Sequence, residues 1–265
     1  MEKNKIYNQD CISYMKSLQI GKDGFEGFDL IIADPPYFSI FGEFDFIWKN
    51  VEEYLVWSKQ WIVEAKRVLK LNGSFYMWGG IGKGTGYQFP KLAIWIDEEK
   101  IFHTVNWITQ RNTRGYGCYK GYIQAREELI FCVNNESQYT WNPAFLDEKS
   151  SRKDLGANGK PRKNEFKRAT DVWSDITEAS QSSKERFKLS DGTAFPTVKA
   201  QALCERIIKA SSNKGDLIYI PFAGSGSEII SCMSNQREWV ATEISSIYIE
   251  EIINKRIKSL QSNNL

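Results

Sequence analysis

Histidines and paired cysteines are scarce in this sequence, and their scarcity excludes several kinds of site. His103 is the single histidine, so a His-rich metal centre is not expected and any Ser-His-Asp triad would have to use it. No two cysteines form a Cys-x-x-Cys pair, and their odd number disfavours a disulfide framework or a zinc site. The five are Cys11, Cys118, Cys132, Cys204 and Cys232. We therefore expect no metal, and we interpret His103 as a structural residue.

Long apolar runs are missing as well. No stretch of 18 or more apolar residues occurs, and the amino-terminal residues 1–5 are not followed by an apolar signal core. We expect a protein that does not cross a membrane and that works in a reducing cytoplasm.

Net charge is also small, since 35 basic residues face 33 acidic ones, which leaves +2. Taken alone, this balance disfavours a strongly basic, partner-binding protein. The average hides a split, however. Residues 149–168 contain eight basic and two acidic residues and carry +6, so the rest of the chain carries −4.

The apolar pattern alternates between short buried runs and longer amphipathic runs, as in repeated β-α-β units. Strands are predicted at residues 28–33, 74–78, 104–109, 128–133, 216–220 and 239–242. Helices are predicted at residues 52–69, 90–99, 198–211, 227–235 and 248–260, with Asn72-Gly73 ending the first. We interpret Trp57 and Trp61 of that helix as core residues. The pattern predicts an α/β fold with a Rossmann-like, mostly parallel sheet and helices on both faces.

Two segments depart from this pattern. Residues 111–126 contain three glycines and four basic residues without an acid, which predicts a mobile basic loop. From residue 139 to about 190 the periodicity fades, which indicates either an insertion domain or a partly disordered loop. We expect Trp141, Trp173 and Phe187 near this stretch to form a small core rather than to stack on a ligand.

The first motif with chemical content is Asp34-Pro35-Pro36-Tyr37, at the carboxyl end of a predicted strand, where open α/β sheets place their sites. Two prolines remove two backbone N–H donors, so the carbonyls around them are left to accept from a ligand. A carboxylate beside such carbonyls suits an amino group with two N–H donors, and Tyr37 adds a flat face. A plain strand-ending turn is the competing interpretation, because Asp and Pro are common in turns.

The second motif is Phe222-Ala223-Gly224-Ser225-Gly226, between a predicted strand and a helix, with Glu243 closing the next strand. Glycines allow a ligand to approach the backbone, and an acid about 20 residues on binds ribose hydroxyls in such folds. A third glycine and a Lys-Ser/Thr pair are both absent, which favours a nucleoside cofactor without a pyrophosphate. A tight structural turn is the alternative here.

Together, the two motifs make the chain resemble the amino-methylating DNA methyltransferases that use S-adenosylmethionine. Their order along the chain, with the amino-group motif first, is similar to the β group of that family. The resemblance covers nearly the whole chain. It implies a catalytic part at residues 1–138, a target-recognition insertion at 139–192 and a cofactor-binding part of the same domain at 193–265.

The resemblance also implies roles for individual residues. Asp34 and the carbonyl of Pro35, with Pro36, would hold the target amino nitrogen, and Tyr37 would stack on a base flipped out of double-stranded DNA. S-adenosylmethionine, which becomes S-adenosylhomocysteine, would be bound by ten residues besides Asp34. They are Asp10, Cys11, Thr197, Lys199, Phe222, Gly224, Ser225, Gly226, Glu243 and Ile244. Among them, Glu243 would bind the ribose and Asp10 would lie by the adenine.

Double-stranded DNA is the partner that the resemblance implies, in the nucleoid of a prokaryote or of a phage-infected cell. A homodimer and a cognate restriction endonuclease stay open as further partners. Lysine and arginine side chains of the two basic segments would contact phosphates and read bases. They are Arg111, Arg114, Lys120, Arg152, Lys153, Lys160, Arg162, Lys163, Lys167 and Arg168. A solvated charged loop is the alternative for each of them.

Several positions depart from the family pattern. Ile220 stands where members usually have Asp, Phe195 replaces a usual His, Ser227-Glu228 replaces Thr-Thr, and Ala241 replaces Gly. These departures motivate one alternative, a catalytically weak or partner-dependent member that only binds nucleic acid. Asp34 is typical of adenine-N6 enzymes, so we favour methylation of adenine at N6. Cytosine-N4 methylation and RNA methylation stay open as alternatives.

Overall fold

The computed structural model describes residues 1–38, 47–81, 86–116, 120–149, 164–179 and 186–263. Ten strands are found there: β1 (Lys5–Asn8), β2 (Phe28–Ala33), β3 (Leu69–Gly79), β4 (His103–Tyr116), β5 (Gln124–Val133), β6 (Phe145–Lys149), β7 (Phe166–Arg168), β8 (Val172–Trp173), β9 (Leu217–Ile220) and β10 (Glu238–Glu243). The helices are α1 (Cys11–Ser17), α2 (Val51–Val68), α3 (Gln88–Glu98), α4 (Gln201–Ser211), α5 (Ser227–Ser234), α6 (Ser246–Tyr248), the π-helix η2 (Ile249–Ile253) and α7 (Asn254–Asn263).

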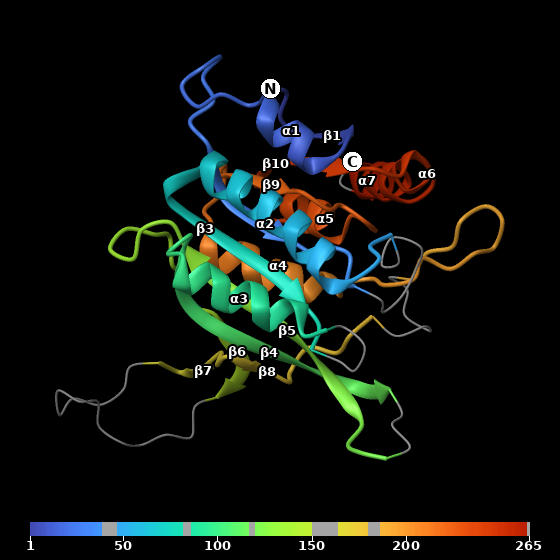
Figure 1. Cartoon of the computed structure of the whole chain (residues 1–265). Helices are drawn as coiled ribbons and strands as arrows, with labels where there is room; N and C mark the ends of the chain where they lie inside the picture. Colours follow the sequence, from blue (N-terminus) through green and yellow to red (C-terminus); the bar gives the residue numbers. More distant parts are fainter. Residues whose placement is uncertain (39–46, 82–85, 117–119, 150–163, 180–185, 264–265) are drawn as a thin grey trace.

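Eight of these strands form one sheet in the order β1-β10-β9-β2-β3-β5-β4-β8 (Figure 1). Every neighbouring pair is parallel except the two that involve β5, which runs antiparallel to β3 and to β4. Helices cover both faces of this sheet. The predicted α/β class, with a mostly parallel sheet between two helical layers, is confirmed.

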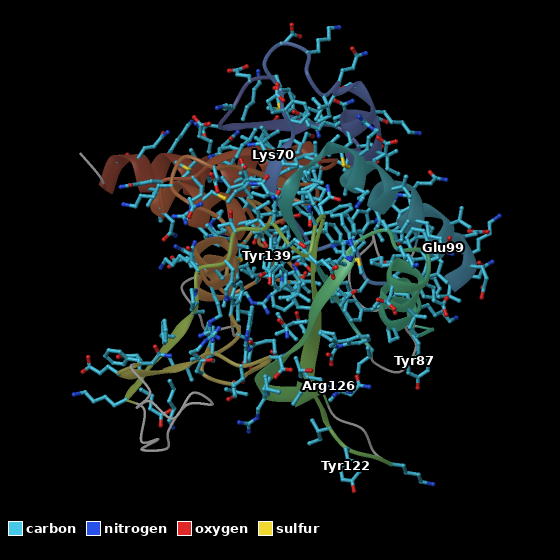
Figure 2. The ribbon with its side chains drawn as sticks, turned by 90° about the vertical axis from the view of Figure 1, so that its left-hand side faces the viewer. Lys70, Tyr87, Glu99, Tyr122, Arg126 and Tyr139 are labelled. Carbon is cyan, nitrogen blue, oxygen red and sulfur yellow. The ribbon has the colours of Figure 1, made fainter. Side chains whose placement is uncertain are left out.

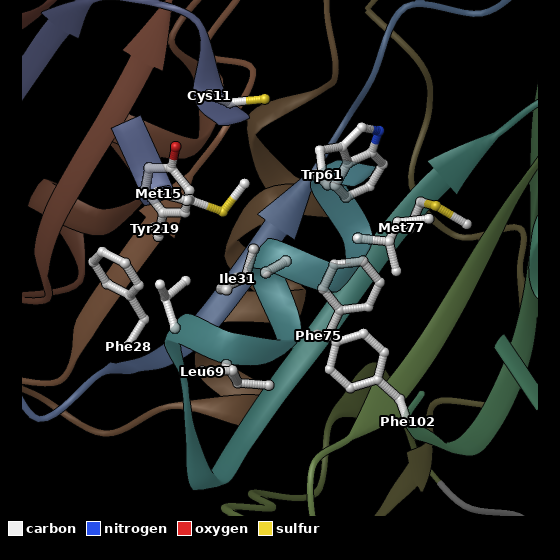
Figure 3. Packing of buried hydrophobic residues seen from close by; sticks show 14 of the residues in the cluster. Cys11, Met15, Phe28, Ile31, Trp61, Leu69, Phe75, Met77, Phe102 and Tyr219 are labelled. Atoms are coloured by element: carbon white, nitrogen blue, oxygen red, sulfur yellow. The ribbon is translucent and has the colours of Figure 1, made fainter. Parts of the chain in front are cut away.

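Alternation along the central strands explains the two layers. On β2, Ile31 and Ala33 pack into one buried cluster with α1, α2 and α3, while Leu30 and Ile32 pack into another with α4, α5 and α7. Successive side chains of a strand point to opposite faces, so an unbroken apolar run serves a strand that is buried on both sides. Figure 3 shows the first cluster, where Phe75 of β3 stacks on Phe102 at a centroid distance of 4.6 Å.

Helix α2 begins where the sequence supplies the right cap. The Asn50 side chain accepts from the backbone N–H of Glu53 at 2.9 Å, and the Glu53 carboxylate accepts from the N–H of Lys49 at 3.0 Å. This reciprocal pair satisfies two backbone donors at the helix start. Acidic residues in its first turn and basic residues in its last turn complement the helix dipole.

The prediction of a loop at residues 111–126 is largely wrong. Strand β4 continues to Tyr116 and β5 begins at Gln124, and Arg111 pairs with Arg126 across the ladder. The two strands form a hairpin that extends beyond the sheet (Figure 1). The sequences of residues 111–115 and 124–126 are mostly polar, so no apolar alternation marked these strands.

Three element boundaries also differ from expectation. Helix α2 ends at Val68, and Asn72-Gly73 lies inside β3, because Leu69 already pairs with Phe28 of β2. Strand β1 precedes the one predicted as first. The last predicted helix is interrupted by the π-helical turn η2.

The insertion region at residues 139–192 contributes β6 and β7, which pair with each other, and β8, which extends the main sheet. Trp173 of β8 is buried in the second cluster, as expected of a core residue, whereas Trp141 is 41% exposed. The domain limits at residues 138 and 192 stay a prediction. No helix in the described part of the chain has the length and apolar character needed to cross a bilayer.

Candidate active site

A cavity of about 260 Å³ lies at the carboxyl edge of the parallel strands. The segments that follow β1, β2, β9 and β10 all reach it, because parallel strands end at the same edge of a sheet. Segment 195–199, before α4, and Glu127 of β5 also contribute to its wall. Most of the residues singled out in the two sequence motifs therefore meet in one place.

Asp34 and Tyr37 follow β2 and form the amino-motif end of the cavity. The Tyr37 hydroxyl donates to Asp34 Oδ1 at 3.0 Å, and the Tyr54 hydroxyl of α2 donates to the carbonyl of Pro36 at 2.9 Å. The second bond holds the double-proline turn against α2. The turn thus presents a carboxylate and a phenol ring to the cavity.

Lys199 joins this end to a second carboxylate that the sequence motifs did not include. Its Nζ lies 3.2 Å from Asp34 Oδ1 and 2.7 Å from Glu127 Oε2, and it donates to the Tyr37 hydroxyl at 3.2 Å. The ammonium group also lies over the rings of Tyr37 and Trp78, at 5.3 and 5.0 Å from their centroids. Lys199, Asp34, Glu127 and Tyr37 are called the lysine cluster below.

Burial and charge act in opposite directions on the lysine cluster. Burial raises the pKa of Asp34, Lys199 lowers it, and Glu127 raises it again. Burial by itself lowers the pKa of Lys199, but the two carboxylates outweigh burial and hold that pKa well above its usual value. The lysine therefore stays charged, and it lies between two carboxyl groups.

Glu228 of α5 lies behind the lysine cluster and is buried. Burial first, and the charge of Asp34 second, raise its pKa to about 7. The Cys204 thiol donates to its Oε1 at 3.5 Å. A carboxyl group with this pKa is partly protonated near pH 7, so it adds less than a full negative charge to this wall of the cavity.

Glu243 forms the glycine end of the cavity. Its Oε2 accepts from the backbone N–H of Gly224 at 2.8 Å, and its Oε1 accepts from that of Ser245 at 2.9 Å. Gly224 has φ +50°, a left-handed conformation that favours glycine. Asn8 supports the same strand end by donating to the carbonyls of Glu243 and Ile244.

The amino-terminal segment closes the cavity beside Glu243. Asp10 caps α1 by accepting from the N–H of Ser13 at 2.9 Å, which fixes the turn after β1. Cys11 follows it and is buried, and burial raises the pKa of its thiol. A buried thiol with a raised pKa is a poor nucleophile, so Cys11 contributes shape to the cavity.

The structure brings together most residues expected at the site. Those that line the cavity are Asp10, Cys11, Asp34, Pro35, Pro36, Tyr37, Thr197, Lys199, Phe222, Gly224, Ser225, Glu243 and Ile244. Gly226 is not among them; it is the N-cap of α5, and a Cβ at this position would lie 3.2 Å from Ile253 Cγ1. Phe195, which replaces a usual histidine, lines the cavity and meets Tyr248 edge-on at 4.8 Å.

Sequence reasoning missed several residues of the cavity wall, among them Trp48, Trp57, Glu127 and Glu228. Trp48 precedes α2 and borders the cavity. Trp57 of α2 packs against the first buried cluster, as expected of a core residue, and also borders the cavity, while Trp61 is fully buried in that cluster. Glu127 was missed because its partner Lys199 lies 72 positions away in sequence. Glu228 was noticed as a departure from the family pattern, but its burial beside the lysine cluster was not foreseen.

The basic residues expected to bind DNA are only partly described. Arg152, Lys153, Lys160, Arg162 and Lys163 lie outside the described residues, as does the side chain of Arg114. Arg111 and Lys120 lie exposed on the outer part of the β4–β5 hairpin. Lys167 forms an ion pair with Glu148 between β7 and β6. Arg168 borders a second cavity of about 340 Å³.

The described residues include no cluster of three His, Cys, Asp or Glu side chains able to hold a metal ion. His103 lies at the start of β4, at the opposite end of that strand from the hairpin, and its Nδ1 is 3.9 Å from Glu136 Oε2. It does not border the cavity.

Comparisons with known proteins agree with this geometry. The DNA methylase family model, which covers N6 and N4 enzymes, matches residues 28–255. Type II methyltransferase M.HpaI of Haemophilus parainfluenzae is 30% identical over 91% of this chain and 71% of that protein. DNA adenine methyltransferase YhdJ of Escherichia coli (strain K12) is 28% identical over 94% of this chain and 81% of that protein.

A solved structure shows the same fold. The crystal structure of the M1.HpyAVI–SAM complex superposes with a TM-score of 0.63 at 20% identity, over 96% of this chain and 98% of that one. The family model spans both motifs and the strands that carry them. The chain therefore belongs to the N6/N4 DNA methylase family and is a DNA methyltransferase.

Proposed function

We propose that the chain transfers a methyl group from S-adenosylmethionine to the N6 amino group of an adenine flipped out of double-stranded DNA, at a specific sequence. One observation carries this proposal. The Asp34 carboxylate and the Glu243 carboxylate, from separate strand ends, border one cavity. A group that accepts from an amine and a group suited to ribose hydroxyls thus share a space that holds a small ligand.

The residues at the glycine end fit S-adenosylmethionine, which supplies an electrophilic methyl group when bound. Each Glu243 oxygen accepts one backbone N–H and keeps a further acceptor position for a ribose hydroxyl. The left-handed backbone at Gly224 leaves the strand end free of a side chain. Phe222 and Trp57 supply apolar wall to the cavity, and the centroids of their rings lie 5.8 Å apart.

At the amino-motif end, Asp34 would accept an N–H of the target amino group, and Tyr37 would stack on its base. Methylation of a neutral amine leaves that nitrogen positively charged until it releases a proton. The carboxylate of Asp34, with Glu127 behind Lys199, would stabilise this positive charge as it develops. Lys199 favours the ionised form of Asp34, because its charge opposes the rise that burial causes in the Asp34 pKa.

Adenine is favoured over cytosine on two grounds. Asp34 at the first position of the amino motif resembles adenine enzymes, and YhdJ, a relative at 28% identity, is a DNA adenine methyltransferase. Base flipping follows from chemistry, because an amino group inside the stack cannot reach the cofactor cavity. The cytoplasmic location, the homodimer and the companion endonuclease stay predictions.

Mass spectrometry of nucleosides tests the target base. The chain is expressed in cells that lack adenine and cytosine-N4 methylation, and their DNA is digested to nucleosides. We expect N6-methyladenine without N4-methylcytosine, and no modified base with the Asp34→Ala variant at equal expression. N4-methylcytosine alone would contradict adenine as the target. Sequencing of the same DNA gives the recognised site.

A further inference from the structure

We propose that the outer part of the β4–β5 hairpin is a DNA-inserting arm, whose apolar tip occupies the space that the flipped base leaves in the duplex. The hairpin arm is defined as residues 111–116 and 120–126, and its tip as Tyr122 and Ile123. This inference rests on the proposed function and deepens it, because it names the residues that hold the duplex open. Figure 2 shows Tyr122 far out on the hairpin, with Arg126 nearer the body of the protein.

The hairpin arm begins at the wall of the cavity. Glu127, which borders the cavity, pairs with Gln110, and the next pair outward is Arg126 with Arg111. Tyr122 lies five residues beyond Glu127, which corresponds to about 17 Å of extended strand. A groove of B-DNA is only about 8 Å deep. A duplex placed with its target base over the cavity is therefore within reach of the tip.

The base of the hairpin arm is fixed to the protein, so its direction is set before DNA binds. The Gln110 amide donates to the carbonyl of Ile176 at 2.9 Å. The backbone N–H and the hydroxyl of Thr113 donate to the two carboxylate oxygens of Glu178, both at 2.8 Å. Farther out, a Cβ at Gly115 would lie 2.1 Å from Ile123 Cγ2, so the two strands approach closely there.

The charges of the hairpin arm suit a phosphate backbone. Residues 111–126 contain four basic residues and no acidic one. Arg111 and Arg126 lie directly opposite each other in the antiparallel ladder, where side chains share a face and like charges repel. Arg126 is paired with Glu128 at 3.2 Å, at the inner end. A phosphate between the two arginines would turn this repulsion into attraction.

The two tip residues are apolar and exposed, and the exposed Lys120 lies two positions before them. Tyr122 is 98% exposed and Ile123 is 61% exposed. Apolar wedges and aromatic rings are the side chains that enter between base pairs, and a ring stacks on bases whatever their identity. The arm is cationic and lies next to a cavity proposed to take one base. A base-paired duplex therefore suits the apolar tip better as a partner than an apolar protein surface does.

The test compares duplexes that differ in the work needed to flip the target. One duplex carries the recognised sequence with the target base paired, and the other has an abasic position opposite the target. The proteins are the full chain, Tyr122→Ala, Tyr122→Trp and, as a control, Leu71→Ala. Leu71 is 64% exposed on β3, near the other end of the sheet. Single-turnover methylation is measured at saturating S-adenosylmethionine.

We expect Tyr122→Ala to methylate the paired duplex at least tenfold more slowly and the abasic duplex within threefold of the unaltered chain. Tyr122→Trp and Leu71→Ala should stay within threefold on both duplexes. An equal loss of methylation rate on both duplexes, or no loss on the paired duplex, would overturn the proposal that the tip enters the duplex. The first result would indicate an arm that merely holds DNA, and the second an arm with another partner.

A fluorescence measurement separates this proposal from the proposed function. 2-Aminopurine placed next to the target base reports unstacking without any methyl transfer. We expect its fluorescence to rise with the unaltered chain and not with Tyr122→Ala. If no methylation of adenine occurs, the proposed function fails, while the fluorescence still decides whether the tip opens the duplex. An equal rise in fluorescence with both proteins would overturn the proposed role of the hairpin arm.

Discussion

At the glycine end of the cavity, both carboxylate oxygens of Glu243 accept backbone N–H groups, whereas at the amino-motif end Lys199 connects side chains from two other segments. A carboxylate held by backbone groups keeps its place as long as the strand ends do. A cluster of side chains depends on the charge of each member. Under the proposed function, the first end would hold the cofactor in one position, and the second would respond to the charge that the reaction creates.

The largest expected effect is on stability and comes from removing the ammonium group of the lysine cluster. Lys199→Met leaves Asp34 and Glu127 without their cation, and we expect the free energy of unfolding to fall by about 3 kcal/mol. Urea denaturation at pH 7 measures this change. Lys209→Met is the control, because Lys209 pairs with Glu205 in an exposed i,i+4 bridge whose loss costs under about 0.5 kcal/mol. Equal losses in the two variants would contradict the account of the cluster.

The next effect is on cofactor affinity at the glycine end. Glu243→Gln places an amide N–H₂ against a backbone N–H of Gly224 or Ser245, so the end of β10 loses its arrangement. We expect the Kd for S-adenosylmethionine to rise about 10- to 100-fold, which is about 1.4–2.7 kcal/mol. Calorimetric titration measures it, with Glu238→Gln at the start of the same strand as the control. An unchanged Kd would remove Glu243 from the cofactor site.

A smaller effect is expected from Glu127, which acts through Lys199. Glu127→Gln takes away one negative charge, so we expect kcat for methylation to fall about tenfold with the cofactor Kd within twofold. Burial raises the pKa of Asp34 and Glu127 raises it further, so the variant should lower that pKa. Because Asp34 must be ionised, the acid limb of the rate profile should move to lower pH. The exposed Glu136→Gln is the control, and an unmoved limb would leave Glu127 a purely structural role.

The smallest effect concerns Glu228, whose folded pKa of about 7 lies above its usual value of 4.5 because the carboxyl is buried. The folded state then holds the proton more tightly than the unfolded state, so stability falls as pH rises from about 4.5 to about 7. Glu228→Gln removes the titrating group, and its amide carbonyl still accepts from Cys204. We expect the variant to gain on the order of 1 kcal/mol over the unaltered chain between pH 5 and pH 8. Thermal unfolding of both proteins at pH 5 and pH 8 measures this gain. The same change in stability with pH for the two proteins would contradict it.

The difference between the two ends also explains how far the sequence could be interpreted. Asp34 and Glu243 were found because each ends a strand, and strand ends of a parallel sheet meet at one edge. Glu127 was not found because its place depends on the β4–β5 register, which a polar hairpin does not reveal. The place of Trp57 at the cavity was not predicted. Helical spacing shows which residues face the protein interior, but it does not show which of these also border a cavity.

Longer-range pairing sets the other limits of prediction. The two-residue strand β8 joins the sheet beside β4, and Glu178 reaches Thr113 across the same edge. Neither contact has a local signal, because each joins segments about 60 residues apart whose own sequences are polar and aperiodic. Chain segments with strong local periodicity, such as β2 and α2, were predicted to within two residues of their observed ends.

Asp34→Asn tests most directly the claim that the two ends of the cavity divide binding from chemistry. S-adenosylmethionine binding is measured by calorimetry and methyl transfer to DNA is measured on the same protein sample. The variant keeps the size of the side chain and the whole glycine end, so we predict a cofactor Kd within threefold of the unaltered chain and no detectable methyl transfer. Methylation that persists, or cofactor binding that is lost together with it, would contradict the account.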